Sequence, residues 1–223
     1  VTGLGTGKSV VLRNNGGDDL IVSNNGAFTF LTKIGAGDAY NITVYAQPSA
    51  QVCSVISGSG TMPSADVTST STVHPVVSCV EATYTISGIR TVATGIAASV
   101  TGQNYANGVI TYTVSPANAS STITNTNGTT YTIGNLKNGD VVTVSVARTG
   151  YTCTVAGSPF TVGLVNITGA DLSCTVDTYA ITGGKNEAAG SDGATVTATN
   201  SRVGADTTVT NTATGFSVSA QYG

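Results

Sequence analysis

Hydrophobic and polar residues alternate along most of this chain, as expected for strands with one buried face. The alternation is clear over residues 9–14, 40–45 and 141–146, and no segment has the spacing of an amphipathic helix. Clusters of Asn, Gly and Asp, such as 15–18, 24–26 and 35–38, separate the alternating segments and favour hairpin turns. Further strands are expected at 27–31, 165–174 and 194–200. Over residues 1–79, roughly seven short strands about ten residues apart predict an all-β fold of antiparallel sandwiches.

This pattern occurs two and a half times, which predicts tandem domains rather than one core. Residues 26–44, followed by Cys53 and Cys79, correspond to residues 128–146, followed by Cys153 and Cys174. A third copy opens at residues 179–183 in the way that the second opens at residues 84–88. We therefore expect tandem antiparallel β-sandwich repeats: 1–79, with a truncated opening strand, 80–174, and an incomplete repeat over 175–223.

Short connections at residues 80–82 and 175–177 join the copies, and they predict a stiff rod rather than a flexible tether. The third copy contains no cysteine before Gly223. Three interpretations stay open. The chain is a window from a longer array, a neighbouring subunit donates the missing strands, or the tail is disordered.

The four cysteines predict two structural disulfides, one in each complete copy: Cys53 with Cys79, and Cys153 with Cys174. Each first cysteine follows a hairpin strand, and each second cysteine closes its copy. Their spacing lacks the clustered ligands of a metal site, and free buried thiols in a cytosolic protein are the less economical alternative. We therefore expect an exported, extracellular protein in which each bridge contributes roughly 3 kcal/mol.

Composition narrows the functional classes. Charged residues make up 9% of the 223 residues, Trp is absent, and the net charge is -3. One His and eight Lys and Arg residues leave little for acid–base chemistry or phosphate binding. We therefore expect no enzyme, no cofactor and no nucleic-acid partner. We also expect no membrane span, because no apolar run approaches roughly 18 residues.

Acidic residues and the single histidine are the candidates for ion binding or catalysis. Asp18 and Asp19 could bind calcium, and the alternative is a turn in which Asp bonds its own backbone. Asp38 and Asp140 each follow a glycine at corresponding positions, which favours a structural role. His74 has no recurring partner, so we expect no nucleophile–His–carboxylate system.

Sugar chemistry has few candidate residues. Glu81 and Glu187 lie in different copies, which disfavours a glycosidase pair. Tyrosines could stack on a sugar ring, but they are scattered along the sequence, and core positions are the alternative. They are Tyr40, Tyr45, Tyr105, Tyr112, Tyr131, Tyr151 and Tyr222. Glycosylation triplets begin at Asn41, Asn118, Asn127 and Asn166, and they arise readily in a chain so rich in Asn and Thr.

Residues 11–20, 25–30, 40–53 and 58–62 resemble a repeat found in large secreted and surface proteins of bacteria. The resemblance is close over 1–79 and loose over 83–174. More broadly, the pattern is similar to the immunoglobulin-like, or prealbumin-like, sandwiches of bacterial adhesins and extracellular fibres. Some members carry Lys–Asn isopeptide bonds, but neither Lys8 nor Lys137 recurs in register, so we expect none here.

The resemblance implies a structural role on a bacterial surface. The expected function is a stalk, adhesin or fibre subunit that self-associates, with strand complementation between subunits as one route to a polymer. Two alternatives stay open: a carbohydrate-binding or spacer module of a secreted protein, and a phage decoration domain. The fold by itself implies no ligand, because sandwiches host many functions.

Overall fold

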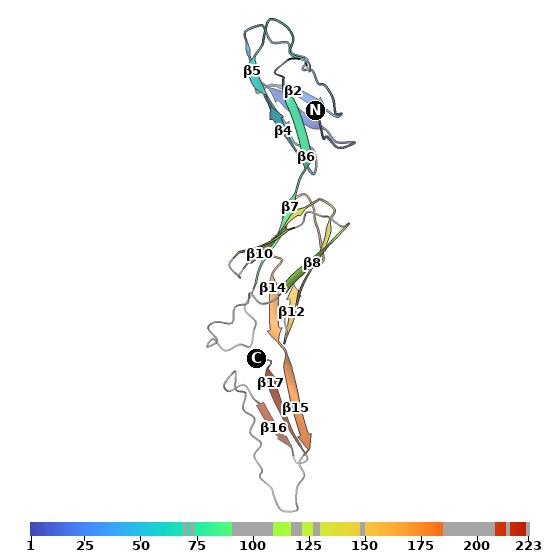
Figure 1. Cartoon of the computed structure of the whole chain (residues 1–223), viewed down its shortest axis with the longest axis vertical. Coiled ribbons are helices and arrows are strands. Elements are labelled where there is room, and N and C mark those ends of the chain that lie inside the picture. Colours follow the sequence, from blue (N-terminus) through green and yellow to red (C-terminus); the bar gives the residue numbers. More distant parts are fainter. Residues whose placement is uncertain are drawn as a thin grey trace, which may run out of the picture. The chain divides into compact units, whose positions relative to one another are not determined.

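The computed structural model describes residues 1–68, 71, 74–90, 109–116, 122–126, 130–147, 150–184, 208–212 and 215–221. Within these residues the regular elements are β-strands and there is no helix, so the predicted all-β class is confirmed (Figure 1). Ten strand pairs, from β1 with β2 to β4 with β6, are antiparallel.

The chain divides into two compact units. The first comprises Val1–Tyr84, Asn135–Gly139 and Val162–Val165, and the second comprises Thr85–Gly134, Asp140–Thr161 and Asn166–Gly223. These units group residues that lie close together in space. The division at residues 79 and 174 that the sequence indicates stays a prediction.

The first unit contains a four-stranded and a two-stranded antiparallel sheet. The order of the larger sheet is β2-β1-β3-β5, and the smaller sheet pairs β4 with β6 (Figure 1). The strands are β1 (Val10–Asn14), β2 (Asp18–Val22), β3 (Ala39–Ala46), β4 (Gln51–Ile56), β5 (Ser59–Thr61) and β6 (Val76–Glu81).

Alternation along β1 explains how the core of the first unit forms. Val10, Leu12 and Asn14 are buried on one face, while Val11 and Arg13 on the other face are half-buried. Fully burying an aliphatic side chain contributes roughly 1.5–3 kcal/mol, so this inward face is a main source of stability. The buried cluster consists of Leu4, Val10, Leu12, Val22, Tyr40, Ile42, Cys53, Val77 and Cys79.

The turn between β1 and β2 is tighter than the sequence predicts. Residues 15–17 connect the strands, with Asn15 at φ 48° and Gly16 at φ 77°. The Gly17 N–H donates to the Asn14 carbonyl oxygen over 3.2 Å. Asn and Gly tolerate positive φ, so their order suits this turn.

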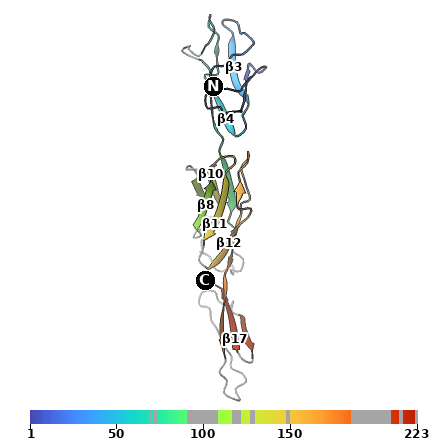
Figure 2. The same ribbon diagram turned by 90° about the vertical axis from the view of Figure 1, so that its right-hand side faces the viewer.

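The second unit contains sheets of order β7-β10-β9, β13-β11-β8, β12-β14 and β15-β17-β16, and β8 lies beside β11 in Figure 2. The first strands are β7 (Tyr84–Ile89), β8 (Val109–Ser115), β9 (Thr122–Thr126), β10 (Thr130–Leu136) and β11 (Val141–Ala147). The others are β12 (Tyr151–Val155), β13 (Phe160–Thr161), β14 (Leu172–Val176), β15 (Thr178–Gly184), β16 (Thr208–Thr212) and β17 (Gly215–Gln221).

Tyr131 on β10 is one of the fully buried side chains of the second unit. Its hydroxyl donates a short hydrogen bond to the carbonyl oxygen of Ala170. Gly88 on β7 lies against the same carbonyl, because a Cβ at that position would lie 2.0 Å from the Ala170 oxygen. Other buried residues here are Ile86, Ile133, Val142, Val144, Phe160, Leu172 and Cys174.

Two strand predictions are wrong. Residues 27–31 alternate, yet they form no strand. Phe28 and Phe30 instead make an edge-to-face contact, with ring centroids 6.1 Å apart, and pack against the core of the first unit. The predicted last strand of the second repeat, 165–174, begins only at Leu172. The predicted strand at 194–200 lies outside the described residues.

Candidate functional site

Both disulfides of the sequence prediction are present, and each joins two neighbouring strands. Cys53 on β4 is bonded to Cys79 on β6, and Cys153 on β12 is bonded to Cys174 on β14. In both sheets the bonded cysteines are directly opposite each other in the antiparallel register. Cys53, Cys79 and Cys174 are buried, so these bridges belong to the inward faces of their sheets.

The free edge of β4 is covered by a side chain at Cys53. The Gln47 Nε2 group donates to the Cys53 carbonyl oxygen over 2.9 Å, and the Cys53 N–H donates to Gln47 Oε1 over 2.6 Å. One carboxamide thus makes the pair of hydrogen bonds that a further strand would make. Exposed strand edges recruit other chains, so this contact protects the edge. Ala147 occupies the corresponding position, six residues before Cys153.

The outward faces of the two disulfide-bearing sheets differ in chemistry. In β4 and β6, Val52 is opposite Val80, and both are largely exposed, at 51% and 62%. In β12 and β14 the corresponding pair is Thr152 opposite Thr175, beside the pair formed by Thr154 and Ser173. At these positions the first face therefore carries exposed valines and the second carries threonine hydroxyl groups.

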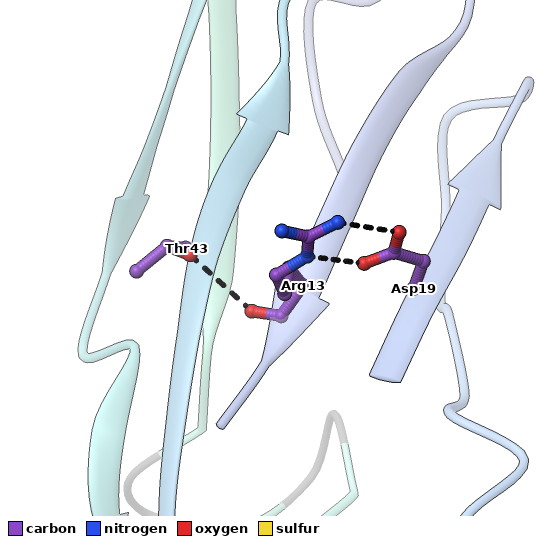
Figure 3. A network of polar contacts seen from close by, with 3 residues as sticks. All are labelled: Arg13, Asp19 and Thr43. Carbon is purple, nitrogen blue, oxygen red and sulfur yellow. Dashed lines mark hydrogen bonds and ion pairs between the residues drawn. The ribbon is translucent and has the colours of Figure 1, made fainter. Parts of the chain in front are cut away.

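Arg13 lies at the centre of a polar cluster on the outward face of the larger sheet. Its Nε and a terminal nitrogen donate to the two carboxylate oxygens of Asp19 over 2.5 and 2.8 Å (Figure 3). The Thr43 hydroxyl donates to the Arg13 carbonyl oxygen over 3.4 Å, from the opposite neighbouring strand. The Arg13 guanidinium carbon also lies 3.3 Å from the ring centroid of Tyr45.

These contacts shift the pKa values of both charged groups. The hydrogen bonds from Arg13 lower the pKa of the Asp19 carboxyl below its usual value. The same contact with Asp19, assisted by Tyr45, raises the pKa of the Arg13 guanidinium. Arg13 therefore links β2, β1 and β3 by charge-assisted contacts on an exposed surface.

This geometry disfavours a calcium site at Asp18 and Asp19. The two residues belong to β2 rather than to a turn, and adjacent strand residues point to opposite faces. Both Asp19 oxygens are already engaged by Arg13. Among the residues that the structure describes, no group of three or more His, Cys, Asp and Glu could hold a metal ion.

Asp38 and Asp140 lie at equivalent turns, each directly before a strand and after a glycine with positive φ. The Gly37 N–H donates to the Met62 carbonyl oxygen over 2.9 Å, and the Gly139 N–H donates to the Val162 carbonyl oxygen over 2.8 Å. The turns are thus fixed in the same way. The recurrence of these two glycine turns therefore has a structural explanation.

The remaining charged candidates are not brought together. His74 Nδ1 lies 2.9 Å from the Ser71 carbonyl oxygen, to which it can only donate. Glu81 forms an ion pair with Lys137, and both side chains are exposed. Glu187 lies outside the described residues.

The tyrosines have separate roles. Tyr40 and Tyr131 are buried, Tyr45 lies beside Arg13, and Tyr112 and Tyr151 are half-buried. Tyr105 and Tyr222 lie outside the described residues.

Two of the glycosylation triplets are described. Asn41 is exposed on β3, and Asn166 Oδ1 accepts the Thr85 N–H over 3.0 Å. Asn118 and Asn127 lie outside the described residues.

Sequence reasoning missed two carboxamides that hold the opening segment of the first unit. Asn25 Oδ1 accepts the Leu4 N–H over 2.9 Å, and its Nδ2 donates to the Leu4 carbonyl oxygen over 2.8 Å. Gln51, itself buried, accepts the Gly5 N–H over 2.9 Å and donates to the Gly3 carbonyl oxygen over 2.8 Å. Asn25 was visible as a turn residue, but its partner 21 positions away was not.

Comparisons with protein-family models, curated proteins and solved structures found no match to this chain. Within the described residues, no helix has the length and apolar character needed to span a bilayer. Functional inference therefore rests on the strand pairing, the disulfides and the surfaces described above.

Proposed function

We propose that this protein is an exported structural element, a stalk or fibre segment of a bacterial surface, built from tandem immunoglobulin-like sandwiches. The observation that carries the proposal is the repeated disulfide: each copy closes with a two-stranded sheet whose directly opposed cysteines are bonded. Disulfides persist in oxidising compartments, so a covalent bond repeated in register favours an extracellular role.

The strand order supports the idea of a repeat. The order β1-β3-β5 beside the first disulfide-bearing sheet corresponds to β8-β11-β13 beside the second. The order β7-β10-β9 corresponds to β15-β17-β16 in the third copy. Similar topology with different side chains is expected where duplication of one module lengthens the protein without adding a binding site.

Strand complementation between subunits or repeats is part of this proposal. Two isolated parallel bridges lie along one edge of β7: Ile86 of β7 pairs with Ile167, ahead of β14, and Arg90, just after β7, pairs with Leu172 at the start of β14. β15 corresponds to β7, and it pairs with β17 as β7 does with β10. We propose that a closing strand from a neighbour occupies the second edge of β15.

Two measurements test this function on native material from the producing cells. Alkylation without reductant should leave all four cysteines unmodified, and alkylation after reduction should modify all four. Antibody labelling of unpermeabilised cells should detect the protein on filaments or stalks in electron micrographs. Reduced cysteines in the cell, or labelling that requires permeabilisation, would overturn the proposal.

A further inference from the structure

The outward face of the β4–β6 sheet is a small, uncharged apolar surface. Its cross-strand pairs are Val52 with Val80, Ser54 with Ser78, and Ile56 with Val76. Val52, Ile56 and Val80 are exposed at 51%, 59% and 62%. Single exposed aliphatic residues need no explanation, but here two apolar pairs lie on one face with only a serine pair between them, and groups of exposed apolar residues mark interaction sites.

The second unit provides an internal comparison for this face. At the positions of Val52 and Val80 it has Thr152 and Thr175, and the Thr175 hydroxyl donates to the Thr152 carbonyl oxygen over 3.4 Å. The Thr152 hydroxyl donates to Asp177 over 2.7 Å. Valine and threonine have nearly the same shape and similar strand preference, so the fold does not require valine here.

We propose that the outward face of β4–β6 binds the same face of a second copy of this chain. Along the strands, an apolar pair is followed by the serine pair and then by a second apolar pair. A two-fold axis that crosses the strands at the serine pair therefore places apolar side chains on apolar side chains and serine on serine. Such a self-complementary pattern is the requirement for an isologous contact.

The absence of charged side chains on this face favours a second copy of the chain over a charged partner. None of the six paired side chains is ionisable, so the contact desolvates no charge. The nearest charged residue on the sheet is Glu81, one position beyond Val80. The two-fold axis across the strands places the two copies of Glu81 at opposite ends of the contact, where they do not repel each other.

The size of the face predicts a weak contact. The exposed parts of these side chains amount to about 300 Å² per partner, against about 800 Å² in a stable interface. A single pair of chains would therefore associate weakly, and several such contacts between neighbouring arrays would add by avidity. The role as lateral contact between stalks rests on the proposed function, whereas the self-association itself does not.

Sedimentation of the full chain over a range of concentrations up to about 1 mM tests the inference, because an interface of this size is expected to be weak. The test variant combines Val52→Thr with Val80→Thr, which installs the threonine pair of the second unit. Ile56→Thr, at the other end of the face, is a second variant. The control is Ile21→Thr, which removes an equally exposed aliphatic group (68%) from the other sheet.

We expect the parent chain to form dimers reversibly, and both test variants to weaken dimerisation at least tenfold. The Ile21→Thr control should change the dissociation constant less than twofold. Unchanged circular dichroism and intact Cys53–Cys79 linkage by mass would establish that each variant is folded. A monomeric parent at every concentration, or equal weakening by the control, would overturn the inference. Surface localisation of the protein would be unaffected by either result.

Discussion

Replacing Tyr131 with phenylalanine should destabilise the second unit by a predictable amount. The hydroxyl is fully buried and donates to the Ala170 carbonyl oxygen, which also lies against Gly88. Tyr131→Phe leaves that carbonyl without its donor in a site packed by backbone. The expected loss in the free energy of unfolding is about 1–2 kcal/mol, the cost of leaving a buried acceptor unsatisfied.

The same residue predicts a loss of stability in alkali. Burial, reinforced by the nearby Asp171 carboxylate and opposed by Arg90, raises the pKa of Tyr131 from 10.0 to about 12. Between these values the unfolded chain releases the phenolic proton while the folded chain retains it. Stability therefore falls as the pH rises from about 10 to 12, by about 2–3 kcal/mol in all. The Tyr131→Phe variant should lack this part of the decline.

Urea unfolding at pH 8 and at intervals up to pH 12 measures both effects, with hydrogen exchange of β10 peptides reporting on the second unit. Tyr112→Phe on β8 is the control, since in the described part of the chain its hydroxyl has no hydrogen bond. Equal unfolding midpoints for Tyr131→Phe and the parent would refute the buried hydrogen bond. Parallel alkaline declines would refute the raised pKa.

Three further predictions concern the first disulfide, a closely packed glycine and the Gln47 carboxamide at the edge of β4. Joint Cys53→Ala and Cys79→Ala substitution should lower stability by about 3–4 kcal/mol in urea unfolding, because a loop closed in the unfolded chain is released; an unchanged midpoint would contradict this. Gly88→Ala should cost more than about 2 kcal/mol in a thermal melt, whereas Gly17→Ala, which has open space around it, should be nearly neutral. Gln47→Leu should cost about 1 kcal/mol and accelerate amide exchange at Cys53; unchanged exchange there would argue against edge capping.

Strand alternation predicted the all-β class and cysteine spacing predicted both disulfides, because both signals depend on local pattern. Val10, Leu12 and Asn14 alternate and are buried together, and the cysteines recur at the same place relative to their strands. Phe28 and Phe30 alternate in the same way, yet they form no strand. Periodicity specifies which side chains are buried, but not whether a backbone partner is present.

The features that the sequence did not predict depend on partners far along the chain. The Gln47 carboxamide resembles any polar loop residue until its contact with Cys53 is known. Asp18 and Asp19 were weighed as a calcium site or as part of a turn, but Asp19 lies in β2 opposite Arg13. The contrast between Val52 and Thr152 was readable, since aligning the two copies on their cysteines places these residues at the same position.

The two cystines also determine how far this chain can be stretched. Cys53 and Cys79 are 26 residues apart, and Cys153 and Cys174 are 21 apart. At about 3.4 Å per extended residue, the bridges withhold about 90 Å and about 70 Å of chain from extension, even after every strand pair has separated. Under tension, each copy would therefore yield a shorter length than its residue count allows, and reduction would restore the missing length.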